Sequence, residues 1–464
     1  MKFNFSTTLS FLSVITVGVI CCLLFFYFSF PVLGPDSGYY LAVARMMYSG
    51  KVFFTEIAVP YNPLAIATVG LPYLFTEQPD YRLSLFINVI FTLGSSVILF
   101  YILEKFKNNS NHFNRFISLL FILLCLSFDG SHILLEPISV FLQLSALSIY
   151  LRYRQKLHFS FLLVCGIFLG LSFLAKQFGL FLLLPIGFDI LIRRNNFVKE
   201  GFVLVFGVVL VPGLLFFYYY AKGVEFGSYL QYILGLGMHL DMGNGTGFTY
   251  NFKGLMLALI NFGLFNSYLV VLPLLLFFYR KKIDRSSILF LILPIVSMLV
   301  LYFAYYSHYF VYIIPYCLIA TAYLIHLTDS KRLKYAIAFF FTFSLFFLSY
   351  NTFFDLKKRP SLCEEQRESI RVLNEQIAPH SEVFLSGPTQ AYYTLGAFNS
   401  IKLDKIGFAF PSFLYTQTIM KHLNSGAYLI LSPEKLKSYE SYRGEFEQRE
   451  IVLEGKVYYV LKRK

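Results

Sequence analysis

The chain has 464 residues, of which 57% are hydrophobic and 14% charged, with 55 Phe, 35 Tyr and no Trp. Soluble domains carry about 25% charged residues, so this composition excludes a disordered chain, a collagen-like chain and an ordinary soluble enzyme. Together with a mean hydropathy of +0.63, it indicates a polytopic membrane protein. The net charge of +13 lies in short basic runs between apolar segments, which excludes a basic nucleic-acid-binding domain.

Charge-poor apolar stretches predict about eleven transmembrane helices, because a bilayer core requires about 20 apolar residues per helix. The first stretch follows Lys2 and has no clear small-residue cleavage site, so we interpret it as a retained signal anchor. The predicted spans are residues 9–33, 83–103, 116–128, 133–151, 159–175, 178–192, 201–221, 254–279, 286–307, 309–325 and 335–354.

The basic residues predict the orientation of these spans. Alternate loops carry most of the Lys and Arg residues and are therefore expected to be cytoplasmic. This places the N-terminus in the cytoplasm of a multi-pass protein of the plasma (inner) membrane. The first loop, residues 34–81, and the C-terminal segment then lie outside. We predict a transmembrane module over residues 1–354 and a small extracytoplasmic α/β domain over residues 355–464.

The C-terminal segment has soluble-domain patterns. Residues 364–377 have apolar positions at helical spacing, and a second helix is predicted between residues 413 and 423. Strands are predicted over residues 383–385, 428–431 and 457–461. We find no nucleophile or metal-binding constellation in this segment.

The first outer loop contains a candidate catalytic acid. Pro35-Asp36-Ser37 is a helix-start pattern, and the apolar residues after it recur at helical spacing, which predicts an amphipathic helix at the membrane surface. A second interfacial helix is predicted over residues 63–75. The alternative interpretation is a solvated loop in which Asp36 only caps the helix.

A second acid lies inside an apolar span. Charges there are costly and are functional candidates by default. His132 and Glu136 stand four residues apart, so a helix would bring them to one side. The alternative for Glu136 is a buried ion pair or a helix-start carboxylate favoured by the helix dipole.

Two cations complete the set at the outer membrane edge. Lys176 lies between two apolar segments, where an ammonium can hold a phosphate; alternatively, it anchors a helix end by snorkelling. His308 opens a later span and is a further candidate, with a structural role as its alternative. Acids and cations at one membrane edge indicate a site for an amphiphilic substrate with a polar or phosphate head.

At these residues the chain resembles the GT-C glycosyltransferases, in the branch of the bacterial protein O-mannosyltransferase-like enzymes and the lipid A aminoarabinose transferase. The resemblance covers roughly residues 9–327. It rests on four elements and a weaker late match, Tyr312 to Pro315. The four elements are Asp36, Tyr39, Tyr40 and Arg45; Tyr61-Asn62-Pro63-Leu64; Glu136-Pro137; and Gly170, Leu174, Lys176, Gly179 and Pro185.

The resemblance implies an all-α GT-C-like membrane fold and an inverting hexosyl- or pentosyltransferase. Such enzymes move a sugar from a polyprenyl phosphate to a lipid, glycan or protein hydroxyl outside the cytoplasmic membrane. It implies that Asp36 is the base, Glu136 the second acid and Lys176 the phosphate-binding cation. The family commonly has Asp-Glu where this chain has Asp36-Ser37, so Glu56 or Glu136 is the candidate for the second carboxylate.

The remaining candidate substrate-binding residues are Tyr39, Tyr40, Arg45, Tyr61, His132 and His308. The sequence has no convincing metal-ligand cluster, which leaves dependence on a divalent metal open. Two other functions stay open. One is a flippase or transporter of lipid-linked glycans, and the other is an O-antigen ligase- or polymerase-like enzyme that uses a diphosphate-linked glycan.

Overall fold

The structure is a computed structural model of the whole chain. It describes residues 12–20, 35–54, 57, 62–76, 81–106, 110–127, 132–155, 158–193, 196–233, 288–303 and 307–327. It further describes scattered positions between 335 and 376, residues 383–386, 406–408, 428–431, 433, 444–453 and 456–464.

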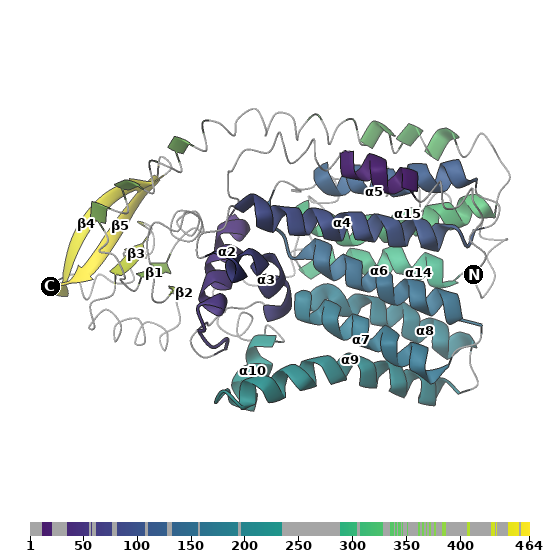
Figure 1. The fold of residues 1–464 in the computed structure, drawn as a ribbon, viewed down its shortest axis with the longest axis horizontal. Helices are drawn as coiled ribbons and strands as arrows, with labels where there is room; N and C mark the ends of the chain where they lie inside the picture. Colours follow the sequence, from purple (N-terminus) through teal and green to yellow (C-terminus); the bar gives the residue numbers. More distant parts are fainter. Residues whose placement is uncertain are drawn as a thin grey trace.

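Long apolar helices form a bundle in which they lie side by side (Figure 1). Two of them, α4 and α9, are long and apolar enough to cross a bilayer by length and composition, while α5, α7, α14 and α15 are shorter apolar helices. The bundle helices are α4 (Tyr81–Leu103), α5 (Asn111–Ser127), α6 (Glu136–Tyr153), α7 (Phe159–Ala175), α8 (Leu183–Arg193), α9 (Phe197–Tyr220), α14 (Ile288–Phe303) and α15 (Phe310–His326).

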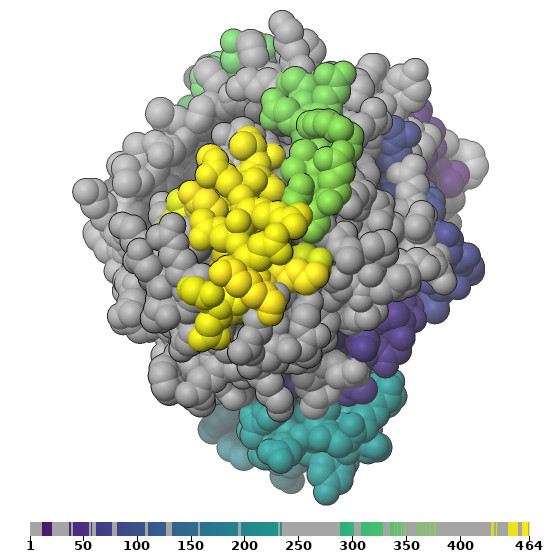
Figure 2. Space-filling model, turned by 90° about the vertical axis from the view of Figure 1, so that its left-hand side faces the viewer, coloured from purple at the N-terminus to yellow at the C-terminus, as the bar shows by residue number. Residues whose placement is uncertain are grey.

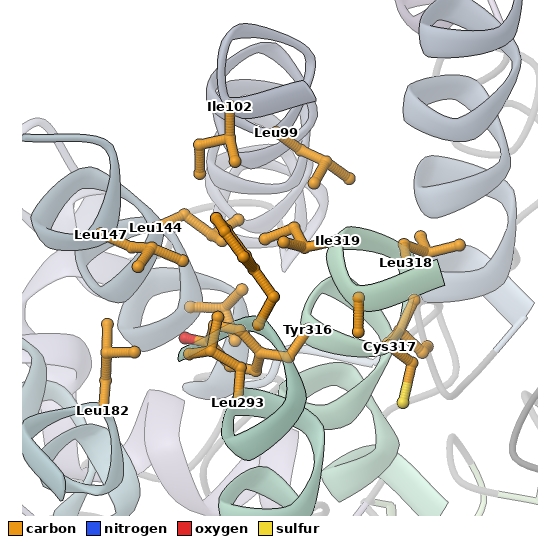
Figure 3. Packing of buried hydrophobic residues seen from close by; sticks show 14 of the residues in the cluster. Leu99, Ile102, Leu144, Leu147, Leu182, Leu293, Tyr316, Cys317, Leu318 and Ile319 are labelled. Carbon is orange, nitrogen blue, oxygen red and sulfur yellow. The ribbon is translucent and has the colours of Figure 1, made fainter. Parts of the chain in front are cut away.

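The centre of the bundle is a hydrophobic cluster built around α15. Nearly every described side chain of this helix is buried, including Tyr316 and Ile319. Figure 3 shows Leu99 of α4, Leu144 of α6 and Leu293 of α14 converging on it. A helix that is apolar on all sides is expected in the middle of a membrane bundle, because its neighbours cover it completely.

Glycines set the distance between α7 and α9. A Cβ atom on Gly166 would lie 2.3 Å from the Leu204 carbonyl oxygen, and one on Gly170 would lie 2.5 Å from the Val208 carbonyl oxygen. Gly207 of α9 faces Gly166 across this seam. Small residues four positions apart let membrane helices approach closely. Here they hold α9 against α7, although most of the apolar surface of α9 is exposed.

A second layer covers one end of the bundle (Figure 1). It contains α2 (Pro35–Tyr48), α3 (Pro63–Val69), the 3₁₀ helix η1 (Leu71–Leu74) and α10 (Phe226–Ile233). At Gly70, a Cβ atom would lie 2.4 Å from the Ala44 Cβ atom, so α2 and the end of α3 pack without intervening side chains.

The C-terminal segment contains a five-stranded sheet. Its order is β2-β1-β3-β5-β4, with β1 parallel to β2 and β3, and β5 antiparallel to β3 and β4. The strands are β1 (Val383–Ser386), β2 (Ile406–Phe408), β3 (Tyr428–Leu431), β4 (Phe446–Leu453) and β5 (Lys456–Arg463).

The sheet lies beyond the second layer, at the end of the molecule (Figure 1). Figure 2 shows β4 and β5 (yellow) beside helical residues of the preceding segment (green), where Arg449 Nη1 donates to Gln376 Oε1 at 3.2 Å. Buried sheet residues, among them Ile430 and Tyr458, share one hydrophobic cluster with Tyr40 and Leu41 of α2. The described helical residues between 364 and 376 agree with the helix predicted there.

Several predicted elements differ from the observed ones. Residues 178–192 do not form one helix, because η2 (Gln177–Leu182) is a 3₁₀ helix and only the remainder is α-helical. The interfacial helix predicted over 63–75 breaks at Gly70 into α3 and η1. The strands β2 and β4 and the helix α10 were not predicted. The predicted span 254–279 and the helix between 413 and 423 lie outside the described residues.

Candidate active site

The site begins where α6 starts, at Glu136-Pro137. Proline fits the first turn of a helix because its missing N–H would have no partner there. Just before it, the Ile133 N–H donates to the Ser37 hydroxyl at 2.8 Å, and Ser37 is fully buried. This contact ties the first turn of α2, which carries Asp36, to the segment that leads into Glu136.

A tight turn at the end of α7 positions Lys176. Lys176 leaves the helix in an extended conformation (φ −158°, ψ 140°) while its N–H still bonds to the Ser172 carbonyl at 2.9 Å. The Gly179 N–H then returns to the Lys176 carbonyl at 2.8 Å. A Cβ atom on Gly179 would lie 2.3 Å from the Ser172 carbonyl carbon, so this turn packs directly on the last turn of α7.

These two helix ends bring Glu136 and Lys176 together as a buried ion pair. Lys176 Nζ lies 2.8 Å from Glu136 Oε1, and the two side chains are 3% and 0% exposed. His308 Nε2 lies 3.8 Å from the same oxygen, and the Lys176 ammonium lies 5.2 Å from the centre of the Tyr309 ring. Burial removes water from both charges, so each depends on the other for compensation.

Two serines fix α6 against α7 one turn below the pair. The Ser139 and Ser172 hydroxyl oxygens are 2.8 Å apart, and the Ser172 hydroxyl donates to the Ser139 carbonyl at 2.9 Å. Both residues are fully buried. Hydrogen bonds between the helices at this depth hold the ends that carry Glu136 and Lys176 in register.

Neither oxygen of the buried Glu136 carboxylate has a well-aligned hydrogen-bond donor among the described residues. Oε1 is nevertheless paired with the Lys176 ammonium at 2.8 Å, so Oε2 is the oxygen left for a further donor. A buried carboxylate oxygen without a donor costs free energy, so this atom is suited to accept a hydrogen bond from a bound hydroxyl. The pair therefore offers a carboxylate oxygen as acceptor and, beside it, an ammonium suited to an anion.

The predicted grouping of His132 with Glu136 on one helical face is wrong. Residues 132–135 precede α6, because the helix starts only at Glu136. His132 instead lines a small pocket with Asn88 of α4 and Pro137. The Asn88 amide is buried there and neither of its polar atoms has a hydrogen-bond partner among the residues that the structure describes, so the pocket suits a bound water.

Tyr40 and Arg45 lie within the second layer. Tyr40 is 1% exposed and belongs to the hydrophobic cluster shared with the sheet, a packing position. Arg45 lies near the Tyr73 hydroxyl of η1; burial raises the pKa of Tyr73 to about 12, and the positive charge of Arg45 opposes that rise.

The side chains of the remaining predicted site residues lie outside the described part of the structure. Asp36 and Tyr39 occupy the first turns of α2. Tyr61 and Glu56 lie outside the described residues. Within the described part of the chain, no three His, Cys, Asp or Glu residues form a group suited to a metal ion.

Four residues of the site were not predicted as functional: Ser37, Ser139, Ser172 and Tyr309. Ser139 stands one helical turn after Glu136 and Ser172 one turn before Lys176, so helical spacing from each charge is the signal that identifies them. Ser37 and Tyr309 carry no such signal, because their roles depend on contacts between distant segments.

The fold of the chain is similar to those of two solved membrane proteins. It matches ArnT from Cupriavidus metallidurans in the apo state with a TM-score of 0.63 at 12% identity, over 96% of this chain and 97% of ArnT. The same enzyme bound to undecaprenyl phosphate matches with a TM-score of 0.61 at 12% identity, over the same shares of the two chains.

Archaeal oligosaccharyltransferase AglB from Archaeoglobus fulgidus, in complex with an inhibitory peptide and a dolichol-phosphate, matches with a TM-score of 0.56 at 12% identity. The match covers 98% of this chain and 74% of AglB. No family model and no curated protein sequence matches the chain. The helical fold expected from the sequence is thus shared with ArnT and AglB.

Proposed function

We propose that the chain is an integral membrane glycosyltransferase that moves a sugar from a polyprenyl-phosphate donor to a lipid, glycan or protein hydroxyl. One observation carries this proposal: a buried carboxylate with an unused oxygen lies 2.8 Å from an ammonium, beside the helix that bears Asp36. The GT-C fold, shared with ArnT bound to undecaprenyl phosphate, supports the lipid-phosphate donor.

In the proposed reaction, the acceptor hydroxyl attacks the anomeric carbon and the bond from that carbon to the phosphate oxygen breaks. Asp36 takes the hydroxyl proton, and the lipid phosphate leaves with the electron pair. Lys176 stabilises the charge that develops on the phosphate. An ammonium has three N–H donors, so Lys176 can serve Glu136 and a phosphate oxygen together. Attack from the face opposite the phosphate inverts the anomeric centre.

Glu136 is proposed as the second carboxylate. Its Oε1 atom faces Lys176, and its Oε2 atom is suited to accept a hydrogen bond from a sugar or acceptor hydroxyl. His308 adds a second donor near Oε1. Tyr39, Arg45, Tyr61 and His132 are proposed as further substrate-binding residues, whereas the buried Tyr40 packs in the cluster shared with the sheet.

The proposed topology has eleven spans, a cytoplasmic N-terminus and an outer active site in the plasma membrane. Residues 1–354 form the catalytic module and residues 355–464 the extracytoplasmic domain. Residues of the C-terminal sheet and of α2 share one hydrophobic cluster. This contact supports a role for the C-terminal domain beside the first outer loop, which contains α2.

The test is transfer by purified, lipid-reconstituted protein. A panel of radiolabelled polyprenyl-monophosphate sugars is supplied with envelope extract as the source of acceptors. We expect label to move into acceptor with wild-type protein and not with Asp36→Asn or Lys176→Gln. Lys222→Gln, in the exposed turn after α9, serves as the matched charge control and is expected to retain transfer.

Failure with every monophosphate donor, in well-folded protein with a competent acceptor, would contradict the proposal. Transfer only from a diphosphate-linked glycan would favour the ligase- or polymerase-like alternative. Sugar-lipid movement across the bilayer without a covalent product would favour the flippase alternative.

A further inference from the structure

A group of cations lies at the end of the bundle opposite Glu136. α4, α6 and α8 all end there, and Lys105, Arg152, Arg154 and Arg193 stand in or just after their last turns. Arg154 donates to the carboxylate of Asp189 through Nε at 2.7 Å and through Nη2, and Arg193 Nε donates to the same carboxylate at 3.0 Å. Asp189 is buried and also accepts the Tyr150 hydroxyl at 2.6 Å.

This arrangement has more positive than negative charge. The single carboxylate of Asp189 is shared by two guanidinium groups, so it does not neutralise them. Lys105 and Arg152 add two further exposed cations. Other described titratable groups at this end of the bundle include Glu104, beside Lys105, and His326 at the end of α15. They also include His112 and Arg115 at the start of α5, and Lys199 and Glu200 at the start of α9.

Aromatic packing brings Lys105 close to Arg154. The ring of Phe106, the residue after Lys105, packs edge-on against Phe290 of α14 with 5.3 Å between ring centres. The Arg154 guanidinium lies over that same Phe290 ring at 5.7 Å. The residue after Lys105 and the guanidinium of Arg154 therefore both contact the Phe290 ring. This shared contact holds Lys105 and Arg154 near each other.

The electrostatics of Lys105 agree with this geometry. Partial burial and the positive charges of Arg152 and Arg154 lower the pKa of Lys105 to about 8. A phosphate placed among Lys105, Arg152 and Arg154 would oppose this shift, because a nearby negative charge favours the charged ammonium.

We infer that the ends of α4 and α6 opposite Glu136 form a binding site for the headgroup of an anionic phospholipid, with Lys105, Arg152 and Arg154 as its cations. Cations at the end of a membrane-spanning helix lie at the depth of the lipid phosphates, and basic pockets between helix ends bind anionic headgroups. The guanidinium groups suit the phosphate oxygens through paired N–H donors.

The full-length protein in nanodiscs tests this inference independently of any transferase activity. We expect native mass spectrometry to show retained phosphatidylglycerol in preference to phosphatidylcholine. Lys105→Gln should weaken that retention about fivefold, the factor that one lysine near an anionic surface contributes. Lys199→Gln, an exposed lysine on the first turn of α9 at the same end of the bundle, removes the same charge outside the group and should weaken retention less than Lys105→Gln does.

The pH dependence provides a second measurement. Since the lipid phosphate favours charged Lys105, retention should be strongest below the pKa of about 8 and fall as the pH rises through it. Lys105→Arg stays charged over this range and should keep retention without that fall. Equal retention of both lipids, equal effects of Lys105→Gln and Lys199→Gln, or displacement of the bound lipid by inorganic phosphate would overturn the inference.

Discussion

At the scale of single residues, the pair of Glu136 and Lys176 decides how the site can work. Each charge is almost fully buried, and they are 2.8 Å apart. Removing one partner of a buried pair is more damaging than removing both, because the remaining charge stays in a dry environment without compensation.

Lys176→Met should therefore lower the free energy of unfolding by about 3–5 kcal/mol. Adding Glu136→Gln to that variant should recover most of the loss, since neither charge remains. Thermal unfolding in one detergent, measured for both single variants and the double variant, checks this coupling. Independent, additive effects would show that the two side chains do not depend on each other.

Gly179 controls the same pair through the backbone. Gly179→Ala would place a methyl group 2.3 Å from the Ser172 carbonyl carbon, and such overpacking costs about 1–3 kcal/mol. The turn that carries Lys176 must move away from α7, so we also expect weaker donor use in the transfer assay. Gly187→Ala in α8, where a Cβ atom meets nothing within 4 Å, is the control and should change neither stability nor transfer.

At the scale of elements, the sequence predicts single helices better than the contacts between them. The prediction for residues 159–175 matches α7 at both ends, because an uninterrupted apolar run leaves few alternatives in a bilayer. The prediction for 178–192 is half wrong. Nothing in its apolar composition distinguishes a 3₁₀ turn from an α-helix, and the difference arises from the packing of Gly179 on Ser172.

The site was predicted to a similar extent. Glu136, Lys176 and His308 were each identified as candidates because charges at apolar spans are costly, and the structure brings these three together. Their pairing could not be predicted, since it depends on the register of α6 against α7. In the sheet, β4 escaped prediction because its charged residues, such as Glu447 and Arg449, obscure the alternation expected of a strand.

The glycine seam gives a prediction for the contact of two helices. Gly166→Leu would place a side chain where its Cβ atom is already 2.3 Å from the Leu204 carbonyl oxygen. We expect α7 and α9 to separate and stability to fall by about 3 kcal/mol or more. Gly213→Leu adds the same side chain to α9 at a position with nothing within 4 Å. Similar melting temperatures for these two variants would show that close packing at Gly166 does not hold α7 against α9.

At the scale of the whole molecule, most of the described core falls into two large hydrophobic clusters, beside a small one around Ile122. One fills the helical bundle, and the other contains α2, the ends of α6 and α7, and residues of the sheet. Leu174 and Ala175, which precede Lys176, belong to the second cluster. The C-terminal sheet and the candidate active site therefore share a packing unit.

Ile430→Ala should reveal this shared unit. Ile430 is 1% exposed, and truncating such a side chain costs about 2–5 kcal/mol. We expect faster hydrogen exchange at α2 amides and unchanged exchange in α5 and α15, which belong to the bundle cluster, measured by mass spectrometry. Val452→Ala, at a side chain that is 54% exposed, is the control. Exchange that increases only in the sheet would show that α2 folds independently of it.

The ion pair also has an electrical consequence. A transmembrane voltage changes the energy of one elementary charge by about 2.3 kcal/mol per 100 mV, but Glu136 and Lys176 carry opposite charges at nearly the same point. The work that the voltage does on one is cancelled by the work on the other. The pair should therefore keep its geometry in energised and in depolarised membranes alike, and a voltage could act on this site only through the charge of what binds there.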